Sequence, residues 1–144
     1  MKKILIGTHN KGKFKEITYL VSKKFKKISP ASLKIKSPKE TGKTFNANAK
    51  LKAKYFSKFT SLPVISDDSG LCIKTLNGRP GIFSARWAKK HGSFKNSMKY
   101  ILKKMKKKKD RSALFVCSLS IKKATGKLLT VSGKIRGEIS HKII

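Results

Sequence analysis

Short apolar runs alternate along this chain with stretches of helical periodicity, and this alternation limits the folds open to it more than any other feature. Ile4 to Ile6 indicates a short buried strand, and a polar turn containing a glycine follows at residues 8–13. The apolar residues after the turn recur at the spacing of one helix face: Phe14, Ile17, Leu20, Val21 and Phe25. A strand that passes through a turn directly into a helix is typical of α/β domains.

The rest of the chain continues the alternation. Helices are expected over about residues 44–58, 83–88 and 94–105, and strands over 63–66, 71–76, 112–121 and 128–136. In the strand 112–121, a period of two places five residues on one face: Ala113, Phe115, Cys117, Leu119 and Ile121. With 144 residues and no internal repeat or linker, the pattern predicts a single α/β domain over residues 1–144.

The net charge of +31 is extreme and, taken alone, indicates an anionic partner such as nucleic acid, a nucleotide or a membrane headgroup. Only four of the 37 basic residues are arginine, the residue that supplies bidentate contacts to guanine. Lysine spread evenly over the expected helices and loops is more typical of a compositional bias than of a built surface. Specific nucleic-acid binding is therefore not expected.

The cysteines and the N-terminus point to an ordinary intracellular protein. Cys72 and Cys117 lie far apart and form no C-x-x-C pair, so they indicate neither a zinc site nor a disulfide framework. The apolar run near the N-terminus is too short for a signal peptide or a membrane span. We expect a cytoplasmic location and no membrane partner.

Two of the six acidic residues, Asp67 and Asp68, stand side by side after the apolar run Leu62–Ile65. Ser69 and Gly70 follow, so we interpret the stretch as a strand that ends in a turn with both carboxylates at its tip. Adjacent carboxylates repel each other unless a cation lies nearby. In a chain with so few acids, the pair indicates a functional site that holds a cation.

The turn at residues 8–13 has the composition of an anion site. The first N–H groups of the helix that follows have no partner within the helix, and the helix dipole favours negative charge there. Lys11 and Lys13 add cations. The alternative is an ordinary strand-to-helix connection in which Asn10 caps the helix.

Five segments of the chain form one ordered set of motifs. They are Thr8-x-Asn10-x-x-Lys13-x-x-Glu16, Glu40-Thr41-Gly42-x-Thr44-Phe45-x-x-Asn48-Ala49-x-x-Lys52-Ala53, Asp67-Asp68-Ser69-Gly70-Leu71, Leu76-Asn77-Gly78-x-Pro80-Gly81-Ile82-x-Ser84-Ala85-Arg86, and Arg111-x-Ala113-x-Phe115-x-Cys117. Together they resemble the nucleoside-triphosphate pyrophosphatases of the inosine-triphosphatase type, the bacterial XTP/dITP diphosphatases.

The resemblance implies an elongated mixed β-sheet flanked by helices, with two lobes and a nucleotide cleft between them. It implies hydrolysis of dITP, ITP or XTP to the monophosphate and pyrophosphate, which removes these nucleotides from the pool. It also implies Mg²⁺ and a homodimer. The residue types in the motifs agree with this reaction, because cleaving a phosphoanhydride needs cations, a metal on hard oxygen ligands and a positioned water.

Carried over residue by residue, the resemblance makes Asp68 a metal ligand and the general base for the attacking water, with Glu40 as the second metal ligand. Contacts to the substrate are expected from Thr8, His9, Asn10, Lys11, Gly12, Lys13 and Ser69. Glu16, Asp67 and Arg86 are expected to support the residues that contact the metal and the substrate. Simpler roles stay open, because Asn10 and Ser69 also suit caps or turns, Arg86 a structural contact, and His9 the surface.

The family pattern continues beyond Ile139 with a Gly-Phe-Gly-Tyr-Asp-Pro segment, a later lysine and a Ser-His-Arg that recognise the base and some of the phosphates. None of them occurs here, and Ser140-His141-Lys142 matches the last by its letters only. We therefore interpret the chain as a C-terminally truncated member that keeps the metal site and lacks the base pocket.

Three further interpretations stay open. The first is an inactive truncated member. The second is a small basic nucleic-acid-binding protein that keeps the motifs as relics, and steeply salt-dependent duplex binding would support it. The third is a Maf-type pyrophosphatase, but the Ser-x-Ser-Pro-Arg-Arg opening expected of that group is absent.

Overall fold

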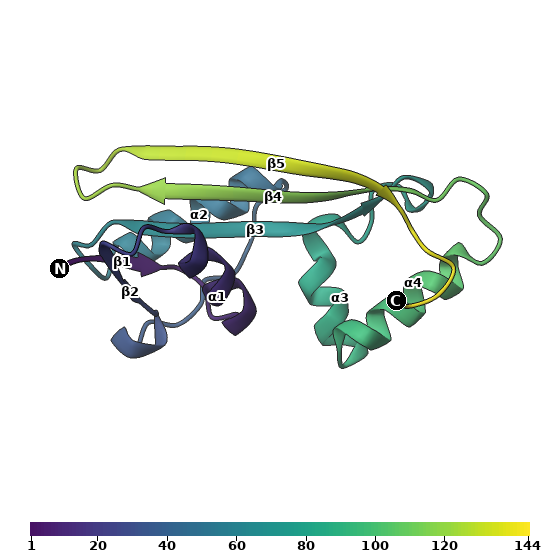
Figure 1. Ribbon diagram of the computed structural model, residues 1–144, viewed down its shortest axis with the longest axis horizontal. Helices are drawn as coiled ribbons and strands as arrows, with labels where there is room; N and C mark the ends of the chain where they lie inside the picture. Colours follow the sequence, from purple (N-terminus) through teal and green to yellow (C-terminus); the bar gives the residue numbers. More distant parts are fainter. The chain divides into compact units, whose positions relative to one another are not determined.

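The computed structural model describes residues 1–144 and contains five strands and four α-helices. In chain order they are β1 (Lys2–Ile6), α1 (Lys11–Leu20), β2 (Phe25–Ile28), α2 (Phe45–Ser57), β3 (Val64–Ile73), α3 (Ser84–His91), α4 (Phe94–Met105), β4 (Ser112–Lys122) and β5 (Leu128–Glu138). The strands form one sheet in the order β2-β1-β3-β4-β5 (Figure 1).

The sheet is mixed, as the sequence predicts. Strand β1 pairs in parallel with both β2 and β3. Strands β4 and β5 are joined by a short turn at residues 123–127, closed by a hydrogen bond from Lys123 N to Lys127 O of 2.8 Å. Only antiparallel neighbours can be joined by so short a connection. The predicted α/β class with a mixed sheet flanked by helices is therefore confirmed.

The chain divides into two compact units. The first comprises residues 1–68 and 118–132, and the second comprises residues 69–117 and 133–144. The division falls within β3, β4 and β5, and each unit has its own apolar core.

The core of the first unit lies on both faces of β1 and β3. On one face Ile4, Ile6 and Ile65 pack against Ile17 of α1. On the other face Leu5 and Val64 pack against Phe56 of α2. Because successive strand residues point to opposite faces, this alternation directs Asp67 toward the α1 face and Asp68 toward the α2 face.

The core of the second unit is built on α4 and the end of β3. Ile73, Ile101 and Met105 form its buried centre. The buried Arg111 guanidinium ties the last residues to it, donating from Nε to Ile139 O at 2.6 Å and from Nη2 to Ser140 O at 2.9 Å. This residue of the fifth motif therefore has a structural role.

No helix of the chain is both long enough and apolar enough to cross a membrane.

The helices were predicted more accurately than their buried faces. The expected helix at 44–58 is α2, with Thr44 as its N-cap, and the expected helix at 94–105 is α4. Leu20, which the helical spacing places on one face with the buried Ile17, is itself 73% exposed. The pattern of the helix at 44–58 also predicts a buried Phe59, and this prediction is wrong because Phe59 is 55% exposed.

Strand β4 packs residues of both faces against the protein, since Leu119 and Ile121 contact the core of the first unit although their face also carries an exposed Phe115. Val116, Ser118 and Ser120 are buried, whereas Phe115 is exposed. The buried serines are satisfied by hydrogen bonds, from Ser118 Oγ to Asn46 Oδ1 at 2.6 Å and between Ser120 Oγ and Thr130 Oγ1 at 3.0 Å. Hydrogen-bonded small polar side chains can occupy a buried face, and apolar alternation does not reveal them.

Candidate active site

The two adjacent carboxylates lie inside a strand and not in a turn. Strand β3 runs without a break through Asp67-Asp68-Ser69-Gly70, so the prediction of a strand that ends at Asp67 was wrong. Asp67 and Asp68 are each only 4% exposed. A buried carboxylate requires charged or hydrogen-bonding partners, and here the partners come from elements distant in the sequence.

The strand–turn–helix at the N-terminus forms as predicted. Asn10 is the N-cap of α1: its Oδ1 accepts the Lys13 N–H at 3.0 Å, and its own N–H donates to Thr8 Oγ1 at 3.1 Å. The capping role that the sequence left open for Asn10 is therefore confirmed. Thr8 is buried beneath the turn, whereas His9, Asn10, Lys11 and Gly12 are exposed around the start of the helix.

The turn lies directly against β3 because residue 7 is a glycine. Ser66 Oγ donates to Gly7 O at 3.1 Å, and Gly7 N donates to Ile65 O at 2.7 Å. A Cβ at position 7 would overlap Ser66 Oγ and would come within 2.7 Å of the Phe56 ring. This close approach brings the start of α1 beside the carboxylates of β3.

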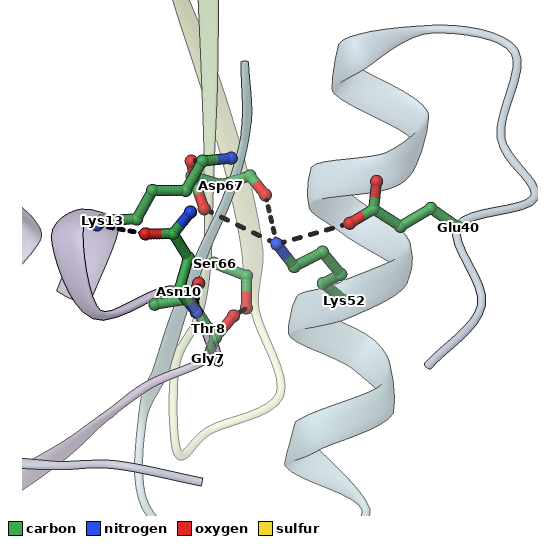
Figure 2. Close-up of polar contacts among 8 residues, drawn as sticks. All are labelled: Gly7, Thr8, Asn10, Lys13, Glu40, Lys52, Ser66 and Asp67. Carbon is green, nitrogen blue, oxygen red and sulfur yellow. Dashed lines mark hydrogen bonds and ion pairs between the residues drawn. The ribbon is translucent and has the colours of Figure 1, made fainter. Parts of the chain in front are cut away.

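Two lysines reach the carboxylates from different helices (Figure 2). Lys13 Nζ of α1 lies 3.1 Å from Asp67 Oδ2. Lys52 Nζ of α2 donates to the backbone oxygen of Asp67 at 2.8 Å and lies 3.6 Å from both Asp67 Oδ1 and Glu40 Oε1. We call Lys13, Glu40, Lys52, Asp67 and Asp68 the carboxylate corner.

Asp68 is the carboxylate that the corner leaves least neutralised. Burial, and secondly the nearby Glu40 carboxylate, raise the pKa of Asp68 from 3.8 to about 6, although Asn48, Lys13 and Lys52 act in the opposite direction. Its Oδ2 is buried and has no hydrogen-bond partner in the protein. An acceptor of this kind beside a second carboxylate suits a bound cation.

The donor set fits Mg²⁺. Nowhere in the chain do three or more His, Cys, Asp or Glu side chains gather as potential metal ligands. Mg²⁺ needs no such cluster, because it is commonly held by one or two carboxylates, with waters and substrate phosphates completing the shell. Glu40 and Asp68 provide two carboxylates, and the oxygen without a partner on Asp68 provides a free ligand atom.

The structure brings together most, but not all, of the predicted site residues. Glu16 is exposed on α1 and forms no ion pair, so the structure does not place it at the corner. Ser69 is half-buried and follows Asp68 in β3, at the start of the second unit. Arg86 lies in α3 of the second unit, with its guanidinium 4.9 Å from the centre of the Phe83 ring.

Lys52 and Asn48 belong to this site, although no role was predicted for either of them. They are one helical turn apart, on the same side of α2, and are 7% and 0% exposed. The signal was present, because these two polar residues interrupt the buried positions of the helix, which are otherwise Ala49, Ala53 and Phe56.

The fold and the carboxylate corner define an α/β protein with a buried site of carboxylates and lysines. A model of the Ham1 family matches residues 4–143, nearly the whole chain. A protein of Caulobacter vibrioides named dITP/XTP pyrophosphatase is 37% identical over 139 residues, which cover 95% of this chain and 72% of that protein. A Haemophilus influenzae protein of the same name is 50% identical over 93 residues, or 64% of this chain and 48% of that protein.

Solved structures agree with the sequence comparisons. A HAM1 protein from Coxiella burnetii superposes with a TM-score of 0.86 at 33% identity, over 99% of this chain and 75% of that one. The Ham1 protein of Staphylococcus aureus gives a TM-score of 0.84 at 34% identity, over 97% and 73%. The chain belongs to the Ham1 family and spans about three quarters of the length of these structures.

Proposed function

We propose that this chain hydrolyses non-standard purine nucleoside triphosphates, namely dITP, ITP and XTP, to the monophosphate and pyrophosphate. The observation that carries the proposal is the carboxylate corner, in which a buried Asp68 with a raised pKa stands with two lysines and a second carboxylate. The relatives named dITP/XTP pyrophosphatase support the substrate class.

The start of α1 and the two lysines are suited to hold a polyphosphate. The first N–H groups of a helix bind phosphate oxygens, and the helix dipole favours their charge. Lys13 and Lys52 lie beside this end of the site, each against a carboxylate oxygen of Asp67. A bound polyphosphate would share the two lysine ammonium groups with Asp67. Without substrate, Asp67 alone orients these lysines.

Asp68 is suited to the role of general base. With a pKa of about 6 it is ionised at pH 7.5 and is still a stronger base than an ordinary aspartate. It would take a proton from the water whose oxygen attacks the α-phosphorus. The bond between the α-phosphorus and the bridging oxygen then breaks, and pyrophosphate leaves.

Glu40 and Asp68 would hold Mg²⁺, which when bound supplies charge neutralisation and polarisation of the phosphate oxygens. A homodimer and a cytoplasmic location belong to the same proposal; sedimentation of the purified chain would measure its oligomeric state.

The test is hydrolysis of dITP and XTP in H₂¹⁸O, with Mg²⁺ or with EDTA. We expect pyrophosphate release that depends on Mg²⁺, with the ¹⁸O label in the monophosphate because water attacks the α-phosphorus. Asp68→Asn should lower the rate by at least about a hundredfold, as expected for loss of a general base. The matched control is Asp110→Asn, an exposed carboxylate of the second unit paired with Lys74 at 3.4 Å. Near-full activity of Asp68→Asn would refute the assignment of the base.

A further inference from the structure

Asn48 is a fully buried polar side chain beside the carboxylate corner, where it lowers the pKa of Asp68. It is 0% exposed and lies in the first turn of α2. Its Oδ1 accepts the Gly42 N–H at 2.7 Å, and its Nδ2 is buried without a hydrogen-bond partner in the protein. A buried amide with one half engaged and the other half open calls for an explanation.

The backbone at Gly42 lies directly on the first turn of α2. A Cβ at position 42 would come within 2.6 Å of Asn48 Oδ1, 2.9 Å of Ala47 Cβ and 3.0 Å of Asn48 N. Two of these three atoms are parts of the helix that cannot move away easily. A side chain at residue 42 would therefore lift the segment from the helix and break its hydrogen bond to Asn48.

Glu40 is the residue of the carboxylate corner that precedes this contact in the chain. It lies two residues before Gly42, and its Oε1 is 3.6 Å from Lys52 Nζ. Lys52 in turn lies one helical turn after Asn48, so α2 contacts the segment at two points: the backbone of Gly42 and the side chain of Glu40. The Glu40–Lys52 pair is 3.6 Å long and involves a partly exposed carboxylate on a flexible side chain, so it fixes the backbone less firmly than the short hydrogen bond from Gly42 N to the buried Asn48 does.

We propose that Asn48 is a positioning residue that holds the segment 40–42 on α2 and thereby fixes the Glu40 carboxylate beside Lys52 and Asp68. The inference rests on the proposed function for the catalytic importance of Glu40, but the anchoring itself does not. A purely structural Asn48 would stabilise the fold without acting through Glu40.

The anchoring is tested without any substrate, by NMR hydrogen exchange at single backbone amides. In Asn48→Leu, a variant of similar size without polar atoms, the Gly42 amide should exchange about tenfold faster or more, because its hydrogen bond is lost. Gly42→Ala should expose the amides of residues 41–43 in the same way. Asn48→Asp keeps an acceptor for Gly42 and should keep its amide protected.

The matched control is Asn96→Leu, which removes an asparagine that also anchors a loop, through a 2.9 Å hydrogen bond from Nδ2 to His91 O in α3. It should leave exchange at Gly42 unchanged. If Gly42 stays equally protected in Asn48→Leu, the anchoring is refuted. If Asn48→Leu does not fold by circular dichroism, Gly42→Ala decides the same question.

The positioning of Glu40 is tested by a double-mutant cycle on hydrolysis of dITP. Asn48→Leu should lower kcat/KM by about 10–100-fold, the range for residues that orient a metal ligand. In a Glu40→Ala background the same change should cost clearly less, because the positioning of Glu40 is already lost and only the direct effect of Asn48 on Asp68 remains. Equal losses in both backgrounds would refute positioning through Glu40. An inactive wild-type chain would refute the proposed function, and the exchange of Gly42 would still decide the anchoring.

Discussion

Replacing Asp68 by asparagine should stabilise the fold while it removes activity. The carboxylate is buried and stands near Glu40, and both effects raise its pKa from 3.8 to about 6. The ionised form of Asp68 is therefore less favourable in the folded chain than in the unfolded chain. Asparagine has nearly the same shape and carries no charge.

The size and the pH range of this gain follow from the pKa. The rise from 3.8 to about 6 sets an upper limit of ~3 kcal/mol, and solvent screening at the corner reduces it to ~1–2 kcal/mol. Between pH 4 and pH 6 the folded chain holds a proton on Asp68 that the unfolded chain has lost, so wild-type stability falls as the pH rises through this window. The gain from Asp68→Asn is therefore largest above about pH 6 and disappears toward pH 4.

Thermal unfolding followed by circular dichroism in EDTA measures the gain. At pH 8 the Tm of Asp68→Asn should exceed that of the wild type by roughly 3–6 °C for a chain of this size. At pH 4 the two should be nearly equal. A lower Tm at pH 8, or the same difference at both pH values, would refute the account of Asp68.

Asp110→Asn is the control, because the surroundings of this exposed carboxylate lower its pKa instead of raising it. Hydrogen bonds from Ser112, and more weakly the neighbouring Lys74, hold the pKa of Asp110 below its usual value. The Ser112 N–H donates to Asp110 Oδ1 at 2.9 Å. Removing this charge should not raise the Tm at pH 8.

Four further predictions follow from the same contacts. Lys52→Met should abolish pyrophosphate release and lower the free energy of unfolding by ~2–4 kcal/mol in urea titrations, because Asp67 loses a buried cation and a 2.8 Å hydrogen bond. Gly7→Ala should cost ~1–3 kcal/mol in the same titrations, because its Cβ has no room against Ser66 and the Phe56 ring. Thr44→Ala should cost ~1 kcal/mol of unfolding free energy, because it removes the N-cap oxygen that accepts the Ala47 N–H at 3.0 Å. The value of kcat/KM should rise with pH as Asp68 loses its proton and then level, with a midpoint at or below about pH 6 because bound Mg²⁺ lowers the pKa of its carboxylate ligand.

The local parts of the fold could be predicted from the sequence, because their signals are local. The apolar run Ile4–Ile6, the polar turn and the cap Asn10 lie within a few residues of one another, and they form the predicted strand–turn–helix. The helix α2 and its cap Thr44 were equally clear. In each of these cases periodicity and capping chemistry agree with the final fold.

Strand β3 could not be predicted in the same way. Asp67, Asp68, Ser69 and Gly70 have the composition of a turn, and two charged residues are a poor signal for a buried strand. Asp67 is tolerated there because Lys13 and Lys52 reach it from two helices. This compensation exists only in three dimensions, so no local rule can anticipate it.

Some residues of the candidate site could also be predicted from the sequence, and others could not. The carboxylates stood out because acidic residues are rare in this chain, with six against 37 basic residues. Lys52 was hidden by the opposite circumstance, as one lysine among many. Lys52 differs from the other lysines because it is only 7% exposed. The sequence indicates this burial only indirectly, since Lys52 lies on the same face of α2 as the buried alanines.

Hydrolysis through Asp68 is checked by the ³¹P NMR spectrum of dITP incubated with Mg²⁺ and either the wild-type chain or the Asp68→Asn variant. We expect equal amounts of pyrophosphate and nucleoside monophosphate with the wild type, and almost none with the variant. Release of orthophosphate with a nucleoside diphosphate, or pyrophosphate formed as fast by the variant, would contradict this expectation.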